Sequence, residues 1–191
     1  MAVKDCLAYA VWMVLMLTLP ATATGYAIRT AATAAVLLGT FGFGWTRKIR
    51  LADLGWGALV GIAVLLVWIA PEHWPLYQKY GILRLFGSGT GDSVAQSGTA
   101  LLIVRLIGSA FVISVAEELF FRRWLIPFAG LGWSVALFAV EHDRYLVGAI
   151  TGLAYGLLYL RKGLGASIAA HAVTNLLLGF YVIHSGEWGL W

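Results

Sequence analysis

Long apolar runs, several of them close to the thickness of a bilayer, are the feature that most restricts how this chain can fold. A transmembrane helix needs about 20 consecutive apolar residues, and candidate runs occur along the chain, with residues 71–99 as the only long loop between them. Hydrophobic residues make up 61% of the chain, charged residues make up 12%, and the mean hydropathy is +0.85. A soluble domain of this size cannot bury that much apolar surface. The predicted fold class is all-α, a polytopic membrane helix bundle of about seven (six to eight) transmembrane helices.

The runs define a single integral membrane domain, residues 1–191, in which residues 100–183 carry the polar motifs described below. They cover residues 6–23, 30–45, 54–70, 100–121, 131–141, 146–160 and 164–183. The fifth and sixth runs are short and could form one broken unit. We expect the fourth helix to end at Ile126, because Pro127 has no N–H and its ring clashes with the preceding turn. Gly148, Gly152 and Gly156 form a stripe of small residues that predicts close helix packing.

The first run allows two interpretations. Lys4, the apolar stretch and the sequence Ala21-Thr22-Ala23 resemble a signal peptide with its cleavage site. The stretch is about 18 residues long, which exceeds a usual signal-peptide core. This length favours a retained transmembrane helix. The single cysteine, Cys6, excludes an intramolecular disulfide.

Basic residues are distributed unevenly between the two sides of the predicted bundle. Alternation of the runs places eight on the side of the N-terminus and four on the other side. The first group is Lys4, Arg47, Lys48, Arg50, Arg122, Arg123, Arg161 and Lys162, and the second is Arg29, Lys79, Arg84 and Arg144. Cytoplasmic loops carry an excess of lysine and arginine, so the N-terminus is predicted to be cytoplasmic. The net charge of +4 therefore indicates orientation rather than a nucleic-acid partner. Arg105, near the outer end of its run, is expected to extend to the membrane interface.

Two adjacent carboxylates, Glu117 and Glu118, interrupt the fourth run. Each charge near the centre of a membrane helix costs about 2.5–3.5 kcal/mol, so both residues need a partner or a function. Glu118 and Arg122 are four residues apart and share a helix face, which predicts an ion pair. Glu117 is rotated about 100° from Glu118 around the helix and needs another partner. Its position is suited to a general base.

Three further polar residues lie in later runs: His142 at the end of the fifth, and His171 and Asn175 four residues apart on one face of the seventh. At a rise of 1.5 Å per residue, Glu117, His142 and His171 lie roughly 14, 16 and 10 Å from the basic side. The sequence therefore predicts one polar layer inside the membrane, reachable from the cytoplasmic side. Imidazole and carboxamide donors in that layer could stabilise an oxyanion. Glu141, Asp143 and Arg144 are interpreted mainly as an interfacial cluster that orients the helix end.

Three ordered motifs, Glu-Glu-x-x-x-Arg (Glu117, Glu118, Arg122), Phe-x-x-x-His (Phe138, His142) and His-x-x-x-Asn (His171, Asn175), give the chain a family resemblance. The chain resembles the CAAX-protease and bacteriocin-processing (CPBP) family of glutamic intramembrane endopeptidases over about residues 110–180. The stretch from Phe138 to Tyr145 looks like that of a bacterial subgroup associated with exosortase sorting systems.

The resemblance implies a role for each motif residue. Glu117 would be the general base that activates water, and His142 would help to hold that water. His171 and Asn175 would stabilise the oxyanion, while Glu118 and Arg122 would order the site. The resemblance also implies a membrane-associated protein or peptide substrate, a lipid-modified one included, a bacterial or archaeal cell membrane, and no cofactor or metal. The substrate sequence and the oligomeric state are not indicated.

Two other classes of function stay open from the residues alone. Glu117, His142 and His171 could ligate zinc, since two histidines and one glutamate form a known catalytic set. Against this, the chain has no His-Glu-x-x-His helix, and asparagine is a poor zinc ligand. A non-catalytic scaffold or immunity protein is also compatible with the spans, as is a proton-coupled transporter that uses Glu117 as its proton site. A transporter is usually built from paired halves, which this chain does not show.

Overall fold

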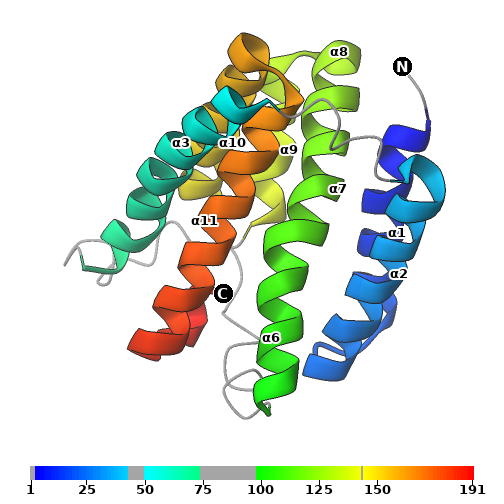
Figure 1. Ribbon diagram of the computed structural model, residues 1–191, viewed down its shortest axis with the longest axis vertical. Helices are drawn as coiled ribbons and strands as arrows, with labels where there is room; N and C mark the ends of the chain where they lie inside the picture. Colours follow the sequence, from blue (N-terminus) through cyan, green and yellow to red (C-terminus); the bar gives the residue numbers. More distant parts are fainter. Residues whose placement is uncertain (1–2, 43–49, 74–97, 143) are drawn as a thin grey trace.

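The computed structural model describes residues 3–42, 50–73, 98–142 and 144–191. These residues form a bundle of helices without a strand, which confirms the predicted all-α class (Figure 1). Three helices are long and apolar enough to cross a membrane, and a fourth is apolar but shorter. The three are α3 (Leu51–Ile69), the long helix Thr99–Ala129 and α11 (Leu164–Ser185), and the shorter one is α9 (Leu131–Glu141). Together these apolar helices indicate an integral membrane protein.

The first two helices, α1 (Lys4–Thr18) and α2 (Ala23–Phe41), begin and end earlier than the runs 6–23 and 30–45 predict. Pro20 lies in the connection, where its missing N–H does not interrupt a helix. Thr22 then caps α2, because its side-chain oxygen accepts a hydrogen bond from the Gly25 amide at 3.1 Å. Hydropathy predicted the existence of both helices, whereas Pro20 and the Thr22 cap determine where α1 ends and α2 begins.

The fourth helix is longer than predicted and runs through Pro127 to Ala129. It consists of α6 (Thr99–Ile107), α7 (Ser114–Glu118) and α8 (Ile126–Ala129), which are joined by the π-helical segments Gly108–Ile113 and Leu119–Leu125. The expected end at Ile126 is therefore wrong. The wider backbone turn that directly precedes Pro127 lets the helix continue past it. Gly130, with φ of 90°, ends the helix in a conformation that favours glycine.

The fifth and sixth predicted runs form two separate helices, α9 and α10 (Tyr145–Lys162), that pack against each other. The predicted glycine stripe is the contact surface. A Cβ on Gly148 would lie 3.1 Å from the Ala139 Cα, and one on Gly152 would lie 3.1 Å from the Phe138 ring. Because Gly148 and Gly152 have no side chains, Phe138 and the end of α9 can approach the backbone of α10 closely.

A second close contact joins α3 to α11, which lie next to each other in Figure 1. A Cβ on Gly57 would lie 2.4 Å from the Ala169 Cβ, and a Cβ on Gly61 would lie 2.6 Å from the Ala170 carbonyl oxygen. The Thr174 hydroxyl crosses the same interface and donates to the Gly61 carbonyl at 2.9 Å. This contact fixes α11, the helix that carries His171 and Asn175.

Candidate active site

The Glu118 and Arg122 side chains form the ion pair that their spacing predicted. Arg122 Nε lies 3.1 Å from Glu118 Oε2, and neither side chain is exposed. Arg122 also donates to the Ser134 hydroxyl on α9 at 3.1 Å, and that hydroxyl donates to the Phe121 carbonyl at 2.8 Å. The pair is thus tied to a neighbouring helix, as a buried charge pair requires.

Arg122 therefore does not lie at the membrane surface, and its place among the basic residues of the N-terminal side was wrong. Its guanidinium lies 4.8 Å from the centre of the Phe138 ring, inside the bundle. The next residue, Arg123, lies 3.5 Å from the Asp5 carboxylate at the start of α1. Arg47, Lys48, Lys79 and Arg84 lie outside the described residues.

His171 lies between the two glutamates. Its Nδ1 lies 3.1 Å from Glu118 Oε1, and its Nε2 lies 3.8 Å from Glu117 Oε2. All three side chains are buried, and the ring is stacked on that of Tyr155 at 5.0 Å between centroids. Because the carboxylate of Glu118 accepts from Nδ1, the proton of a neutral His171 is on that nitrogen. Its Nε2 is then left to face Glu117.

Glu117 has a buried oxygen, Oε2, that has no hydrogen-bond partner among the described residues. Its side chain is turned into the bundle rather than towards the lipid, with 6% of its surface exposed. A buried carboxylate oxygen of this kind can still accept a hydrogen bond from a water molecule or a substrate group. Glu117 is thus the carboxylate of the cluster that is available for chemistry, while Glu118 is held by Arg122 and His171.

His142 ends α9, where the backbone leaves the helix with extended dihedral angles. Its Nδ1 lies 2.7 Å from the Phe138 carbonyl oxygen, so this nitrogen carries the proton in the neutral ring. Nε2 then remains as an acceptor. The Phe138 ring connects the two histidines, at 4.5 Å from the centroid of His142 and 5.9 Å from that of His171.

Asn175 contacts the first π-helical segment rather than the glutamates. Its Nδ2 donates to the Ser109 carbonyl at 3.0 Å and to the Ser114 hydroxyl at 3.2 Å. Ser114 also donates to the Ser109 carbonyl, at 2.9 Å. Two side chains therefore satisfy a carbonyl that the wider turn exposes, which stabilises the π-helical geometry next to Glu117. Both amide hydrogens of Asn175 are engaged in these bonds.

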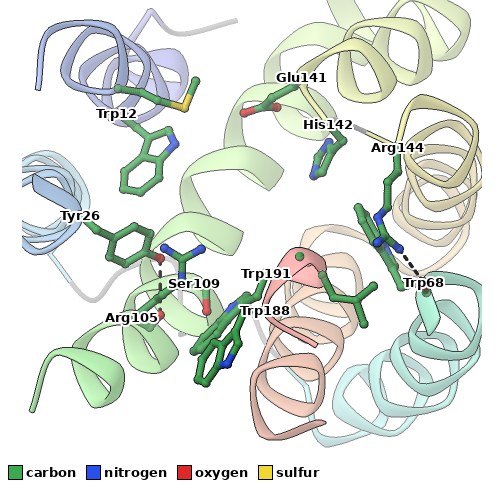
Figure 2. A pocket seen from close by; sticks show the side chains of 13 residues that line it. Trp12, Tyr26, Trp68, Arg105, Ser109, Glu141, His142, Arg144, Trp188 and Trp191 are labelled. Carbon is green, nitrogen blue, oxygen red and sulfur yellow. Dashed lines mark hydrogen bonds between the residues drawn. The ribbon is translucent and has the colours of Figure 1, made fainter. Parts of the chain in front are cut away.

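A cavity of about 330 Å³ opens beside His142 (Figure 2). Its walls come from α6, the π-helical segment Gly108–Ile113, the C-terminal residues, the start of α2, and the C-terminal parts of α1, α3 and α9. The lining residues are Trp12, Met16, Tyr26, Trp68, Arg105, Ser109, Glu141, His142, Arg144, Trp188, Gly189, Leu190 and Trp191. These helix ends are opposite the N-terminus. The described cavity therefore does not open on the N-terminal side from which the polar layer was expected to be reached.

A second, mainly apolar cavity of about 610 Å³ lies between α1, α9 and the second π-helical segment. Its lining includes Tyr9, Phe120, Leu137 and Val140, and it shares Met16 and Glu141 with the first cavity. Val140 and Leu137 have large exposed fractions, 63% and 44%. The apolar cavity therefore lies beside exposed residues of α9 and adjoins the cavity beside His142 at Met16 and Glu141.

Sequence analysis missed the serine, threonine and tyrosine residues that hold the site. They are Ser109, Ser114, Ser134, Tyr155 and Thr174, of which Tyr155 donates to the Thr174 hydroxyl at 2.7 Å. Single hydroxyl residues are common in membrane helices and give little signal in one sequence. Glu141 was assigned to an interfacial cluster, but it lines both cavities. Asp143 lies outside the described residues.

The zinc alternative is not supported by the arrangement of the side chains. Among the residues that the structure describes, no three His, Cys, Asp or Glu side chains converge as a metal-binding group.

The comparisons with known proteins agree with the resemblance found in the sequence. Residues 99–177 match the family model described as type II CAAX prenyl endopeptidase Rce1-like. No curated protein and no solved structure matches the chain. The match covers all three motifs and most of the helices that form the site, and it does not test the exosortase-associated subgroup, which stays a prediction. Over residues 99–177, the chain is therefore similar to the Rce1-like type II CAAX prenyl endopeptidases, which are part of the CPBP family.

Proposed function

We propose that this protein is an intramembrane endopeptidase in which Glu117 activates a water molecule that attacks a peptide bond of a membrane-associated protein or peptide. The observation that carries this proposal is the distance of 3.8 Å between Glu117 Oε2 and His171 Nε2. Two groups at this separation can both lie within hydrogen-bond distance of one water molecule. The family match supports a protease, and the geometry supplies a base for it.

The proposed reaction needs no covalent intermediate with the protein. Glu117 accepts a proton from water, and the hydroxide oxygen bonds to the carbonyl carbon to give a tetrahedral oxyanion. Collapse of that intermediate breaks the C–N bond, and the proton on Glu117 passes to the leaving nitrogen. His142 can hold the water through Nε2, which is an acceptor while Nδ1 donates to the Phe138 carbonyl.

Stabilisation of the oxyanion sets conditions on His171 and Asn175. His171 can donate from Nε2 only as an imidazolium, because the proton of the neutral ring is on Nδ1, which faces Glu118. Asn175 must exchange its bond to Ser109 or Ser114 for a bond to the substrate oxygen. We propose that substrate binding makes this exchange, with Glu118 and Arg122 holding His171 in place.

The cavities indicate how a substrate reaches this site. The apolar cavity between α1 and α9 is suited to a hydrophobic segment or a lipid chain, since its described walls are aromatic and aliphatic apart from Glu141. The cavity beside His142 is suited to the peptide. If the positive-inside prediction holds, the cavity beside His142 opens on the non-cytoplasmic side.

The test compares the unchanged protein with Glu117→Gln and Glu117→Asp. Membranes of cells that express each form are compared for new or lost peptide termini, and the purified proteins are assayed on the peptides so identified. We expect Gln to lower cleavage by at least about 100-fold and Asp, which keeps the charge but withdraws it by one methylene, to lower it less. Full cleavage by the Gln variant would contradict the base assignment, and loss of cleavage upon chelation would favour the zinc alternative.

A further inference from the structure

Arg105, which the sequence predicted to extend to the membrane interface, is turned towards the aromatic rings of the cavity beside His142. Its guanidinium lies 4.8 Å from the centre of the Tyr26 ring and 5.1 Å from that of Trp191, inside the cavity beside His142. Figure 2 shows it on the wall that faces Glu141 and His142 across the cavity. It is half-buried, and its Nε has no hydrogen-bond partner among the described residues. An arginine in this position has donors but no anion.

A second arginine strengthens the positive charge. Arg29 lies behind the cavity wall, with its guanidinium 5.2 Å from the Trp12 ring and 5.7 Å from the Tyr26 ring. It is 7% exposed, and its Nε also lacks a partner among the described residues. No carboxylate of the described residues forms an ion pair with either arginine. A buried and a half-buried cation beside one aromatic ring repel each other, and an anion between them would offset this cost.

We propose that Arg105, supported by Arg29, binds a carboxylate of the peptide substrate in the cavity that His142 lines. The inference rests on the proposed function for its substrate class. Guanidinium groups bind carboxylates with paired, charge-assisted hydrogen bonds. The cavity of about 330 Å³ is within the range of ligand sites. Its aromatic walls, Trp12, Tyr26, Trp68, Trp188 and Trp191, suit the apolar side chains that flank such a carboxylate.

The experiment measures binding, so it does not depend on cleavage. Purified full-length Glu117→Gln protein in a neutral detergent is titrated with N-acetyl-Leu-Leu-Leu as the free acid and as the amide. A second pair, N-acetyl-Leu-Asp-Leu amide and N-acetyl-Leu-Asn-Leu amide, places the carboxylate on a side chain. We expect the acid of at least one pair to bind about tenfold more tightly than its neutral partner. The pair that shows the difference identifies a C-terminal or a side-chain carboxylate as the ligand.

Variants assign the difference to Arg105. Arg105→Gln is expected to bring the ratio of the two dissociation constants close to one, whereas Arg161→Gln, an exposed arginine at the other end of the bundle, leaves it unchanged. Because the ratio is measured within one protein, partial loss of folded material cancels. If the Gln variant does not fold, Arg105→Met keeps the apolar stem over Tyr26 and has the same expected result.

The proposal is overturned if acid and neutral peptides bind equally in the parent protein, or if the ratio persists in the Arg105 variants. It is also overturned if only dioctanoyl phosphatidylglycerol binds in an Arg105-dependent way, which would assign the arginines to a lipid headgroup. Peptide cleavage without acid preference would refute this inference alone. Acid preference in a protein that cleaves nothing would refute the proposed function alone.

Discussion

Arg122 Nε lies 3.1 Å from Glu118 Oε2, with both side chains completely buried, and Glu118 in turn meets His171 Nδ1 at 3.1 Å. One carboxylate thus orients the imidazole and is itself held by the arginine. These two contacts make Glu118 unavailable for proton transfer. Its neighbour Glu117 faces the other nitrogen of the His171 ring. The two adjacent glutamates therefore have different surroundings: Glu118 is held by two partners, whereas Glu117 is the carboxylate that we propose as the base.

Breaking this ion pair from one side should destabilise the fold. We expect Arg122→Met to lower the free energy of unfolding by about 3–5 kcal/mol, because it leaves the buried Glu118 carboxylate without its arginine. Adding Glu118→Gln should recover part of that loss, since the charge is then removed. Unfolding of the purified proteins in mixed micelles measures both values. If the loss of stability in the double variant equals the sum of the losses in Arg122→Met and Glu118→Gln, the two side chains are not coupled.

His142 should matter for cleavage and little for stability. The chain already leaves the helix at this residue, and among the described residues the ring makes one hydrogen bond, to the Phe138 carbonyl. We expect His142→Ala to lower kcat by about 100-fold and to change the free energy of unfolding by no more than about 1 kcal/mol. The exposed His184 near the end of α11 provides the control, because His184→Ala should change neither quantity. A His142 variant with normal kcat would remove it from the site.

The π-helical segment next to Glu117 should depend on Ser114 more than on Ser109. Ser114 donates to the Ser109 carbonyl and accepts from Asn175, whereas the Ser109 hydroxyl only returns to the Leu106 carbonyl of its own helix. We expect Ser114→Ala to cost about 1 kcal/mol of stability and to speed amide hydrogen exchange in residues 108–114. Ser109→Ala keeps the carbonyl and is the matched control. Identical exchange in the two variants would contradict this role of Ser114.

Close packing of α3 on α11 should make Gly61 sensitive to a single methyl group. A Cβ there would lie 2.6 Å from the Ala170 carbonyl oxygen, which is backbone and cannot move away cheaply. We expect Gly61→Ala to destabilise the protein by about 1–3 kcal/mol. Gly55 on the same helix has nothing within 4 Å of the added atom, so Gly55→Ala should be neutral or slightly stabilising. Thermal unfolding of the two variants compares them directly.

The side from which the cavity opens can be tested with single cysteines. Cys6 lies at the start of α1, whereas Gly189 is exposed and lines the cavity at the opposite end of the bundle. We expect a membrane-impermeant maleimide to label Cys6 and a Cys6→Ser/Gly189→Cys protein from opposite sides of the membrane. In intact cells, the second protein should react if the N-terminus is cytoplasmic. Labelling of both positions from the same side would contradict the arrangement of α1 and the cavity.

The helical bundle and the Glu118–Arg122 pair follow from the sequence because both are local properties. Apolar runs of bilayer length specify helices, and a spacing of four places two side chains on one face. The Gly148, Gly152 and Gly156 stripe also predicted correctly that α10 approaches its neighbour closely. The motifs identified the family that the comparison of residues 99–177 then found.

Only the tertiary structure decided how the polar residues meet. Glu117 and His171 are 54 positions apart, and their contact depends on α11 packing against α3 and the π-helical segment. The same holds for the two bonds of Asn175, for the inward position of Arg105 and for the end of the bundle at which the cavity opens. Hydropathy and spacing describe each helix separately. The rotation of one helix against another is set by side-chain volume and hydrogen bonding across the interface, which a single sequence does not specify.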